Sequence, residues 1–79
     1  MDSKTKATRK YLTELPEKKC YLDLMNRAKL TPTERIVCDM KYLEGQNLCF
    51  IGDTLGFSED WTKRIHHSAL KKLSQIIDN

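Results

Sequence analysis

Apolar positions between residues 48 and 73 recur every three or four residues, the spacing that places side chains on one face of a helix. A first short helix is indicated by Leu48, Ile51 and Leu55. A longer second helix carries its inward-facing residues on a single stripe: Thr62, Ile65, Ala69, Leu70 and Leu73. The threonine is the one departure from an apolar stripe, because Val or Ile would pack better in a buried position. The pattern predicts two consecutive helices with facing apolar sides.

The residues between these two helices are typical of a tight turn. Gly56 follows the first helix, at a position where the backbone is often left-handed and glycine is free of strain. Phe57 can fill the turn, and the hydroxyl of Ser58 can cap the next helix. Gly52, on the apolar face of the first helix, lets the second helix approach closely. Together these residues predict a helix-turn-helix.

Two helices are expected near the N-terminus. A basic helix over residues 5–15 has a thin apolar stripe, and Pro16 is expected to end it or to begin the next helix. The following helix is expected to end near Lys29. Its apolar residues recur at helical spacing: Cys20, Tyr21, Leu24, Met25 and Ala28.

A third upstream helix begins with the sharpest local signal outside the helix-turn-helix. Thr31 and Glu34 can form a reciprocal capping box, with Pro32 at the first helical position. The helix is expected to end at Gly45. Its inner side is expected to carry Ile36, Val37, Met40 and Leu43. Its water-facing side is expected to carry Arg35, Asp39 and Lys41.

These segments predict an all-α fold of about five helices, because no stretch has the two-residue period of a strand. The C-terminal helix-turn-helix is expected to lack a wing. Residues 1–29 are interpreted as an N-terminal basic helical extension. Residues 30–79 are interpreted as one compact helix-turn-helix domain.

Composition narrows the class of protein. The net charge is +3, from 14 Lys and Arg against 11 Asp and Glu, which permits nucleic-acid binding without requiring it. Most of this excess lies in residues 1–19, where six Lys and Arg face three acids. No apolar run approaches the roughly 18 residues of a membrane span, and the N-terminus has no signal core. We therefore expect a cytoplasmic protein that does not bind membranes.

No motif for catalysis or cofactor binding is present. The soft metal ligands lack the paired spacing of a zinc site: they are Cys20, Cys38, Cys49, His66 and His67. The three cysteines do not form a disulfide framework and are expected to be reduced and buried. There is no Gly-rich phosphate loop and no nucleophile elbow. A Cys–His pair from distant positions remains an alternative, but a small domain offers little pocket for a substrate. We expect no enzyme activity, no cofactor and no metal.

The block from Leu30 to Leu73 resembles region 4 of bacterial primary sigma factors, the C-terminal region that reads promoters. The shared features are the LTPTER opening, the YLEG joint, the LCFIGDTLGFS turn and the RI…ALKKL ending. Output domains of the LuxR type share the opening and the turn, but the ending favours the sigma family. Residues 1–29 are not covered. A full sigma factor also needs region 2, for which 79 residues leave no room. The resemblance therefore implies a free-standing sigma-like regulator, of the kind found in phages and mobile elements.

In that family the second helix of the motif lies in the major groove and reads the −35 promoter element. The resemblance places Glu59, Asp60, Lys63 and Arg64 at base-reading or phosphate-facing positions. Helical periodicity independently places the same four positions, together with position 67, on the side of the helix opposite the buried stripe. The predicted DNA-binding residues are Ser58, Glu59, Asp60, Lys63, Arg64 and His67. The N-terminal lysines and arginines are expected to contact phosphates nearby.

Several residues depart from the family pattern. Glu59 stands where Arg is usual and Asp60 follows it, so two acids repel phosphates unless each finds a donor. Either this protein reads a DNA sequence different from that of the family, or its affinity for DNA is low. Trp61 replaces a basic residue, and Phe50 replaces a polar one. Phe50 is expected to pack against the N-terminal helices. Alternatively, Phe50 and Trp61 form an exposed apolar patch for a protein partner.

The sequence thus predicts a DNA-binding transcriptional regulator whose partner is double-stranded DNA, acting as a monomer or a homodimer. The alternative is a protein-interaction module of the same fold. Because sigma region 4 also docks on the β-flap of RNA polymerase, such a module would bind polymerase or another regulator without reading bases.

Overall fold

The computed structural model describes residues 3–15 and 17–77, and within these ranges the regular structure is entirely helical. The helices are α1 (Ser3–Thr13), α2 (Lys18–Ala28), α3 (Pro32–Cys38), the π-helical segment η1 (Asp39–Leu43), α4 (Leu48–Leu55) and α5 (Glu59–Ile77). The all-α prediction is confirmed. The first helix was expected over 5–15 and instead ends at Thr13. The expectation for Pro16 lies outside the described residues.

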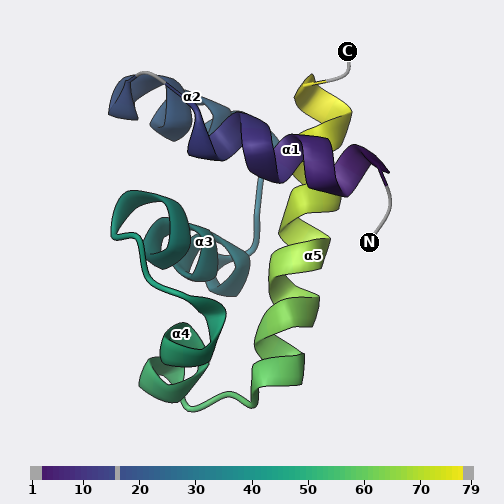
Figure 1. The fold of residues 1–79 in the computed structure, drawn as a ribbon. Helices are drawn as coiled ribbons and strands as arrows, with labels where there is room; N and C mark the ends of the chain where they lie inside the picture. Colours follow the sequence, from purple (N-terminus) through teal and green to yellow (C-terminus); the bar gives the residue numbers. More distant parts are fainter. Residues whose placement is uncertain (1–2, 16, 78–79) are drawn as a thin grey trace.

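Helix α5 is the element on which the others pack. Figure 1 shows α5 along one side of the molecule, with α1 crossing it near its C-terminal end and α4 beside its beginning. Helices α2 and α3 also contact α5. A helix of 19 residues is about 28 Å long, which gives α5 room for two separate cores.

The larger core, which we call the N-terminal core, joins α1 and α2 to the second half of α5. Its buried residues are Leu12, Tyr21, Leu24, Met25, Cys38, Ala69, Leu70 and Leu73. The predicted stripe of α2 is confirmed at Tyr21, Leu24 and Met25, but Cys20 is exposed, because this position lies at the edge of the buried face. Helices α1 and α2 therefore share one core with α5.

The smaller core, which we call the helix-turn-helix core, consists of Val37, Ile51 and Ile65. Met40, Leu48, Leu55 and Phe57 pack around it. The prediction for the inner side of the third helix is correct for Val37 and wrong for Ile36 and Leu43, which are 45% and 36% exposed. Ile36 precedes the π-helical segment η1 and lies about 100° around α3 from Val37, on the side away from the buried Glu34 and Cys38. Leu43 lies at the end of η1, whose wider turn changes its rotation relative to the residues of α3.

Polar contacts fix the start of α3 against α5. The predicted capping box is present: Thr31 Oγ1 accepts from Glu34 N at 3.2 Å, and Glu34 Oε1 accepts from Thr31 N at 3.0 Å. The Glu34 carboxylate also accepts from Ser68 Oγ at 2.6 Å and Lys72 Nζ at 2.7 Å. Burial alone would raise the pKa of Glu34, but these donors outweigh it and lower the pKa to about 2.

A second set of polar contacts connects η1 to its neighbours. Tyr42 Oη and His66 Nε2 share a 2.6 Å hydrogen bond. Asp39, expected to face water, instead accepts from Tyr21 Oη at 3.0 Å and from Arg35 Nε at 3.2 Å. Arg35, Asp39 and Lys41 are half-buried rather than fully exposed. The contacts of Tyr42 with His66 and of Tyr21 with Asp39 link residues far apart in sequence, which explains why helical periodicity did not reveal them.

Candidate nucleic-acid interface

The turn between α4 and α5 has the predicted geometry. Gly56 lies in the left-handed region at φ +79°, and its N–H donates to the carbonyl of Gly52. The Phe57 N–H donates to the same carbonyl at 2.8 Å. Ser58 Oγ accepts from the N–H of Trp61 at 3.2 Å and so caps α5. The chain therefore reverses between the two helices instead of continuing as one, and the helix-turn-helix is confirmed.

Gly52 is the point at which the two helices come closest. A Cβ at this position would lie 2.7 Å from Thr62 Oγ1 and 2.9 Å from the carbonyl oxygen of Phe57. Thr62 is fully buried, and its hydroxyl donates to the carbonyl of Ser58 at 2.8 Å. This bond satisfies the hydroxyl, so threonine fits a stripe position where the sequence pattern favoured Val or Ile.

Gly52→Ala should lower the free energy of unfolding by about 1 kcal/mol. The added methyl group overpacks this contact, which destabilises the fold by about 1–3 kcal/mol. The higher helix propensity of alanine stabilises the fold by about 1 kcal/mol and offsets part of this loss. Urea denaturation measures the change. Asp53→Ala, at the exposed next position of α4, is the control and should change stability little. If Gly52→Ala has the same free energy of unfolding as the wild type, the two helices can move apart without loss of stability, which contradicts this prediction.

The predicted DNA-facing residues lie on the outer side of α5 and its cap. Ser58, Glu59, Asp60, Lys63 and Arg64 are exposed. His67, one turn further along, is half-buried. Because the stripe from Thr62 to Leu73 is buried at every expected position, the opposite side of the first two turns is left to solvent. The structure thus brings the six residues together along one helix.

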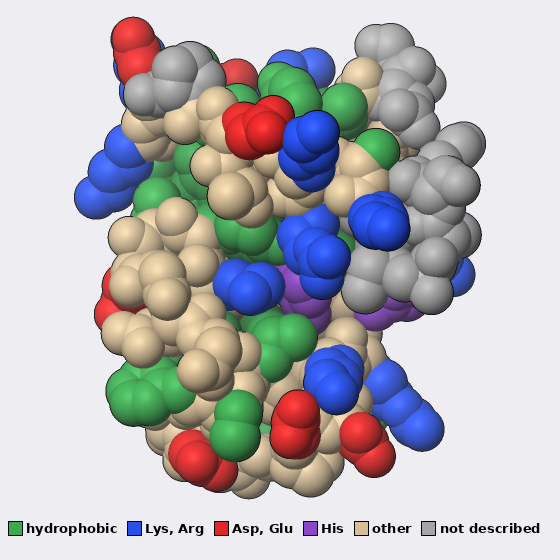
Figure 2. Space-filling model, viewed as in Figure 1, with side chains coloured by type: hydrophobic (Ala, Val, Ile, Leu, Met, Phe, Trp, Pro, Cys, Tyr) green, Lys and Arg blue, Asp and Glu red, His purple; other side chains and the backbone are tan. Residues whose placement is uncertain are grey.

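Charge at this end of α5 is balanced. Lys63 Nζ lies 3.3 Å from Glu59 Oε1, one helical turn away. Both side chains are more than half exposed, so this ion pair is weak and either partner is free to contact a ligand. The two acids Glu59 and Asp60 cancel the two cations Lys63 and Arg64. Figure 2 shows this mixture of red and blue side chains around the lower end of the molecule, where α5 begins.

The expectation that Phe50 packs against the N-terminal helices is wrong. Phe50 is 49% exposed, because it lies on the side of α4 away from the buried Ile51 and Gly52. Trp61 is 51% exposed. It lines a groove between the start of α3 and α5 whose other residues are Thr31, Thr33, Glu34, Phe57, Arg64, Ile65, Ser68 and Lys72. Phe50 is not among the residues that line this groove.

The cysteines and histidines are dispersed. Cys20 and Cys49 are exposed, which corrects the expectation that all three thiols are buried. Cys38 is buried, and its desolvation raises the pKa of the thiol to about 12. Among residues 3–15 and 17–77, no group of three His, Cys, Asp or Glu side chains could hold a metal ion. In the same described ranges, no helix is long and apolar enough to cross a membrane.

The comparisons with known proteins agree with this geometry. The family model of sigma-70, region 4 matches residues 28–75. The matched segment contains α3, η1, α4 and nearly all of α5, whereas α1 and most of α2 lie outside it. Searches of curated proteins and of solved structures gave no significant match. Since the family match covers more than half of the 79 residues and the observed turn has the expected form, the chain belongs to the sigma-70 region 4 family of helix-turn-helix DNA-binding domains.

Proposed function

We propose that this protein is a transcriptional regulator that inserts the first turns of α5 into the major groove of duplex DNA. The observation that carries the proposal is the exposure of Lys63 and Arg64 on a helix that the Gly56 turn directs away from α4. Membership in a family of DNA-binding domains supports the same conclusion.

The exposed side chains suit contact with base edges. The major groove is about 12 Å wide and admits an α-helix. Arg64 and Lys63 can donate to O6 and N7 of guanine or to phosphates. Glu59 and Asp60 can accept from the amino group of cytosine, a contact that favours particular sequences over others. Ser58 and His67 stand at the two ends of this set, where phosphate contacts are expected.

The double substitution Lys63→Ala and Arg64→Ala should weaken binding to duplex DNA by roughly tenfold or more, since it removes both donors at the tip of α5. Fluorescence anisotropy with a random-sequence duplex at several salt concentrations measures the effect. Lys19→Ala with Arg27→Ala serves as the matched control, because it removes two exposed cations from α2 instead. Equal affinities of the wild type and the double variant would contradict the proposed role of α5.

A second candidate function is favoured by the exposed aromatic residues. The half-exposed Trp61 lines a groove together with Phe57 and Ile65, and Arg64 and Lys72 stand at the same groove. Exposed aromatic side chains next to cations are typical of protein interfaces. In this alternative the domain binds RNA polymerase or another regulator without reading bases.

A single set of measurements separates the two functions. Selection of bound sequences from a random DNA pool, with and without polymerase, would return an enriched sequence from the protein alone if α5 reads bases. Tight binding of polymerase with no enrichment and no DNA binding by the isolated protein would favour the interaction module.

A further inference from the structure

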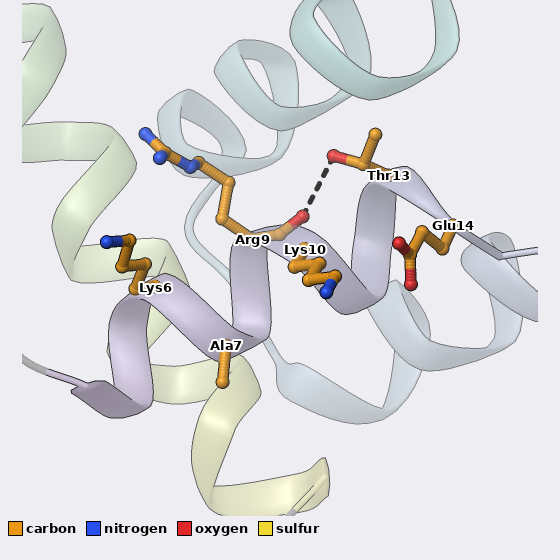
Figure 3. A pocket seen from close by; sticks show the side chains of 6 residues that line it. All are labelled: Lys6, Ala7, Arg9, Lys10, Thr13 and Glu14. Atoms are coloured by element: carbon orange, nitrogen blue, oxygen red, sulfur yellow. Dashed lines mark hydrogen bonds between the residues drawn. The ribbon is translucent and has the colours of Figure 1, made fainter.

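Helix α1 carries an exposed cationic surface outside the segment that the family model matches. Lys6, Arg9 and Lys10 line a shallow depression on this helix, with Glu14 as the one carboxylate among its six lining residues. Figure 3 shows Lys6 and Arg9 extending to the same side of α1, as residues three apart on a helix do. The surface therefore presents three cations to solvent within little more than one helical turn.

Helix α1 packs against α5 and shares a core with it. Leu12 is 4% exposed and belongs to the N-terminal core with Ala69, Leu70 and Leu73 of α5. The positive charges of Arg9 and Lys41 both act on His66 of α5, which places them close to that residue. The α1 cations consequently keep a set position relative to the DNA-facing end of α5.

The surface is continuous with the candidate interface. In Figure 2, blue side chains follow one another from the level of α1 down to the level where α5 begins. Leu70 lies where α1 packs on α5. It is seven residues from Lys63, which corresponds to about 10 Å along the helix axis. The major groove is about 12 Å wide, so a helix that places Lys63 in the groove brings α1 to the level of the flanking phosphates.

The balance of charges at the start of α5 indicates that cations elsewhere are needed to attract DNA. The four charged residues at the start of α5 sum to zero, so this end supplies little net attraction to a polyanion. We propose that α1 is a phosphate-binding element of this protein, in which Lys6, Arg9 and Lys10 contact the DNA backbone beside the groove occupied by α5. This inference rests on the proposed function. In it, α1 supplies affinity through phosphates and α5 supplies selectivity through bases.

The test compares two triple variants with the same loss of three positive charges. The first is Lys6→Ala, Arg9→Ala and Lys10→Ala. The control is Lys18→Ala, Lys19→Ala and Arg27→Ala, which removes three exposed cations from α2. Because Arg9 lies near His66, the double variant Lys6→Ala and Lys10→Ala is added, and circular dichroism checks that each protein is folded.

Binding to a random duplex is measured by anisotropy between 50 and 200 mM salt. Each lost phosphate contact lowers the slope of log K against log salt by about 0.9, so the α1 triple variant should lose about 2.7 and the double variant about 1.8. At the higher salt concentration the triple variant should bind roughly tenfold or more weakly than the control. Sequence preference in a selection experiment should be unchanged, because the bases are read by α5.

The possible failures are distinguishable. If the wild type binds DNA and Lys63→Ala with Arg64→Ala weakens it, but the α1 variants keep the wild-type slope, the inference about α1 is overturned and the proposed function stands. If the control lowers affinity and slope as much as the α1 variant, the effect is one of net charge and α1 has no special role. A wild type that does not bind DNA overturns both.

Discussion

Glu34→Ala should lower the free energy of unfolding by roughly 3 kcal/mol, because a hydrogen bond to a charged group contributes about 1.5–3 kcal/mol and a helix cap about 1 kcal/mol. The Glu34 side chain caps α3 and also joins it to Ser68 and Lys72 of α5. Glu34→Gln should cost less, since its amide oxygen can still accept from Thr31 N. Chemical denaturation followed by circular dichroism measures both variants.

The acid sensitivity of the Glu34 variants provides an independent check. The pKa of Glu34 in the folded protein is about 2, below its ordinary value of 4.5. The carboxylate therefore contributes fully above pH 4.5, and its contribution is lost as the pH falls from 4.5 towards 2. The difference between wild type and Glu34→Ala should shrink over this interval. Glu44→Ala, which removes an exposed carboxylate, is the control, and an effect of similar size there would contradict the role given to Glu34.

Acidification from pH 6.5 to 4 should lower the free energy of unfolding by about 3 kcal/mol through His66 alone. Burial, with the nearby charges of Lys41 and Arg9, lowers the pKa of His66 from 6.5 to about 4. Above pH 6.5 the imidazole is neutral in both states and adds no pH dependence. Between pH 6.5 and 4 the unfolded chain binds a proton that the folded protein does not, so acid favours unfolding.

His66→Gln isolates this contribution, because glutamine fills the same region without titrating. Its stability should vary less between pH 6.5 and 4 than that of the wild type, as measured by denaturation at several pH values. His67→Gln is the matched control, since the neighbouring histidine is only half-buried and the buried one is retained. If both variants keep the wild-type pH profile, His66 is not held neutral in the folded protein.

Local signals in the sequence predicted the helix-turn-helix correctly. Gly56, Ser58 and the Thr31–Glu34 capping box each act within a few residues of the chain, so their geometry follows from their own type and spacing. Every position assigned to the buried stripe of α5 is buried, because a long helix keeps a regular period, but the polar His66 and Ser74 are buried as well and were not predicted.

Contacts between distant residues were not predictable in this way. The bond between Tyr42 and His66, and the bonds from Ser68 and Lys72 to Glu34, join positions 24 to 38 residues apart. The π-helical segment after Cys38 interrupts the regular period, which is why Leu43 was assigned to the wrong side, whereas Ile36 lies before this segment at the edge of the apolar stripe. Phe50 was misassigned for a related reason, since a helical period does not say which neighbour covers a given face.

At the candidate interface, the sequence predicted which side chains are exposed but not how their charges combine. Spacing alone put Lys63 and Glu59 on one face, and the structure adds that they pair. The sequence predicted a basic N-terminal helix and phosphate contacts by its lysines and arginines, but not where this helix lies in the fold. Its position relative to α5 depends on Leu12, whose partners in the N-terminal core include residues of α5 more than 50 positions away: Ala69, Leu70 and Leu73.

Helix α5 contributes residues to both cores and is continuous between them. A change in its orientation in one core therefore moves its end in the other. Its length of about 28 Å means that a tilt of about 5° in the N-terminal core displaces the other end by roughly 2 Å. A displacement of that size is larger than the tolerance of a hydrogen bond, whose donor–acceptor distance varies by only about 0.5 Å. Side chains of the N-terminal core, such as Leu12 and Met25, therefore help to set the position of Lys63 and Arg64 at the other end of α5.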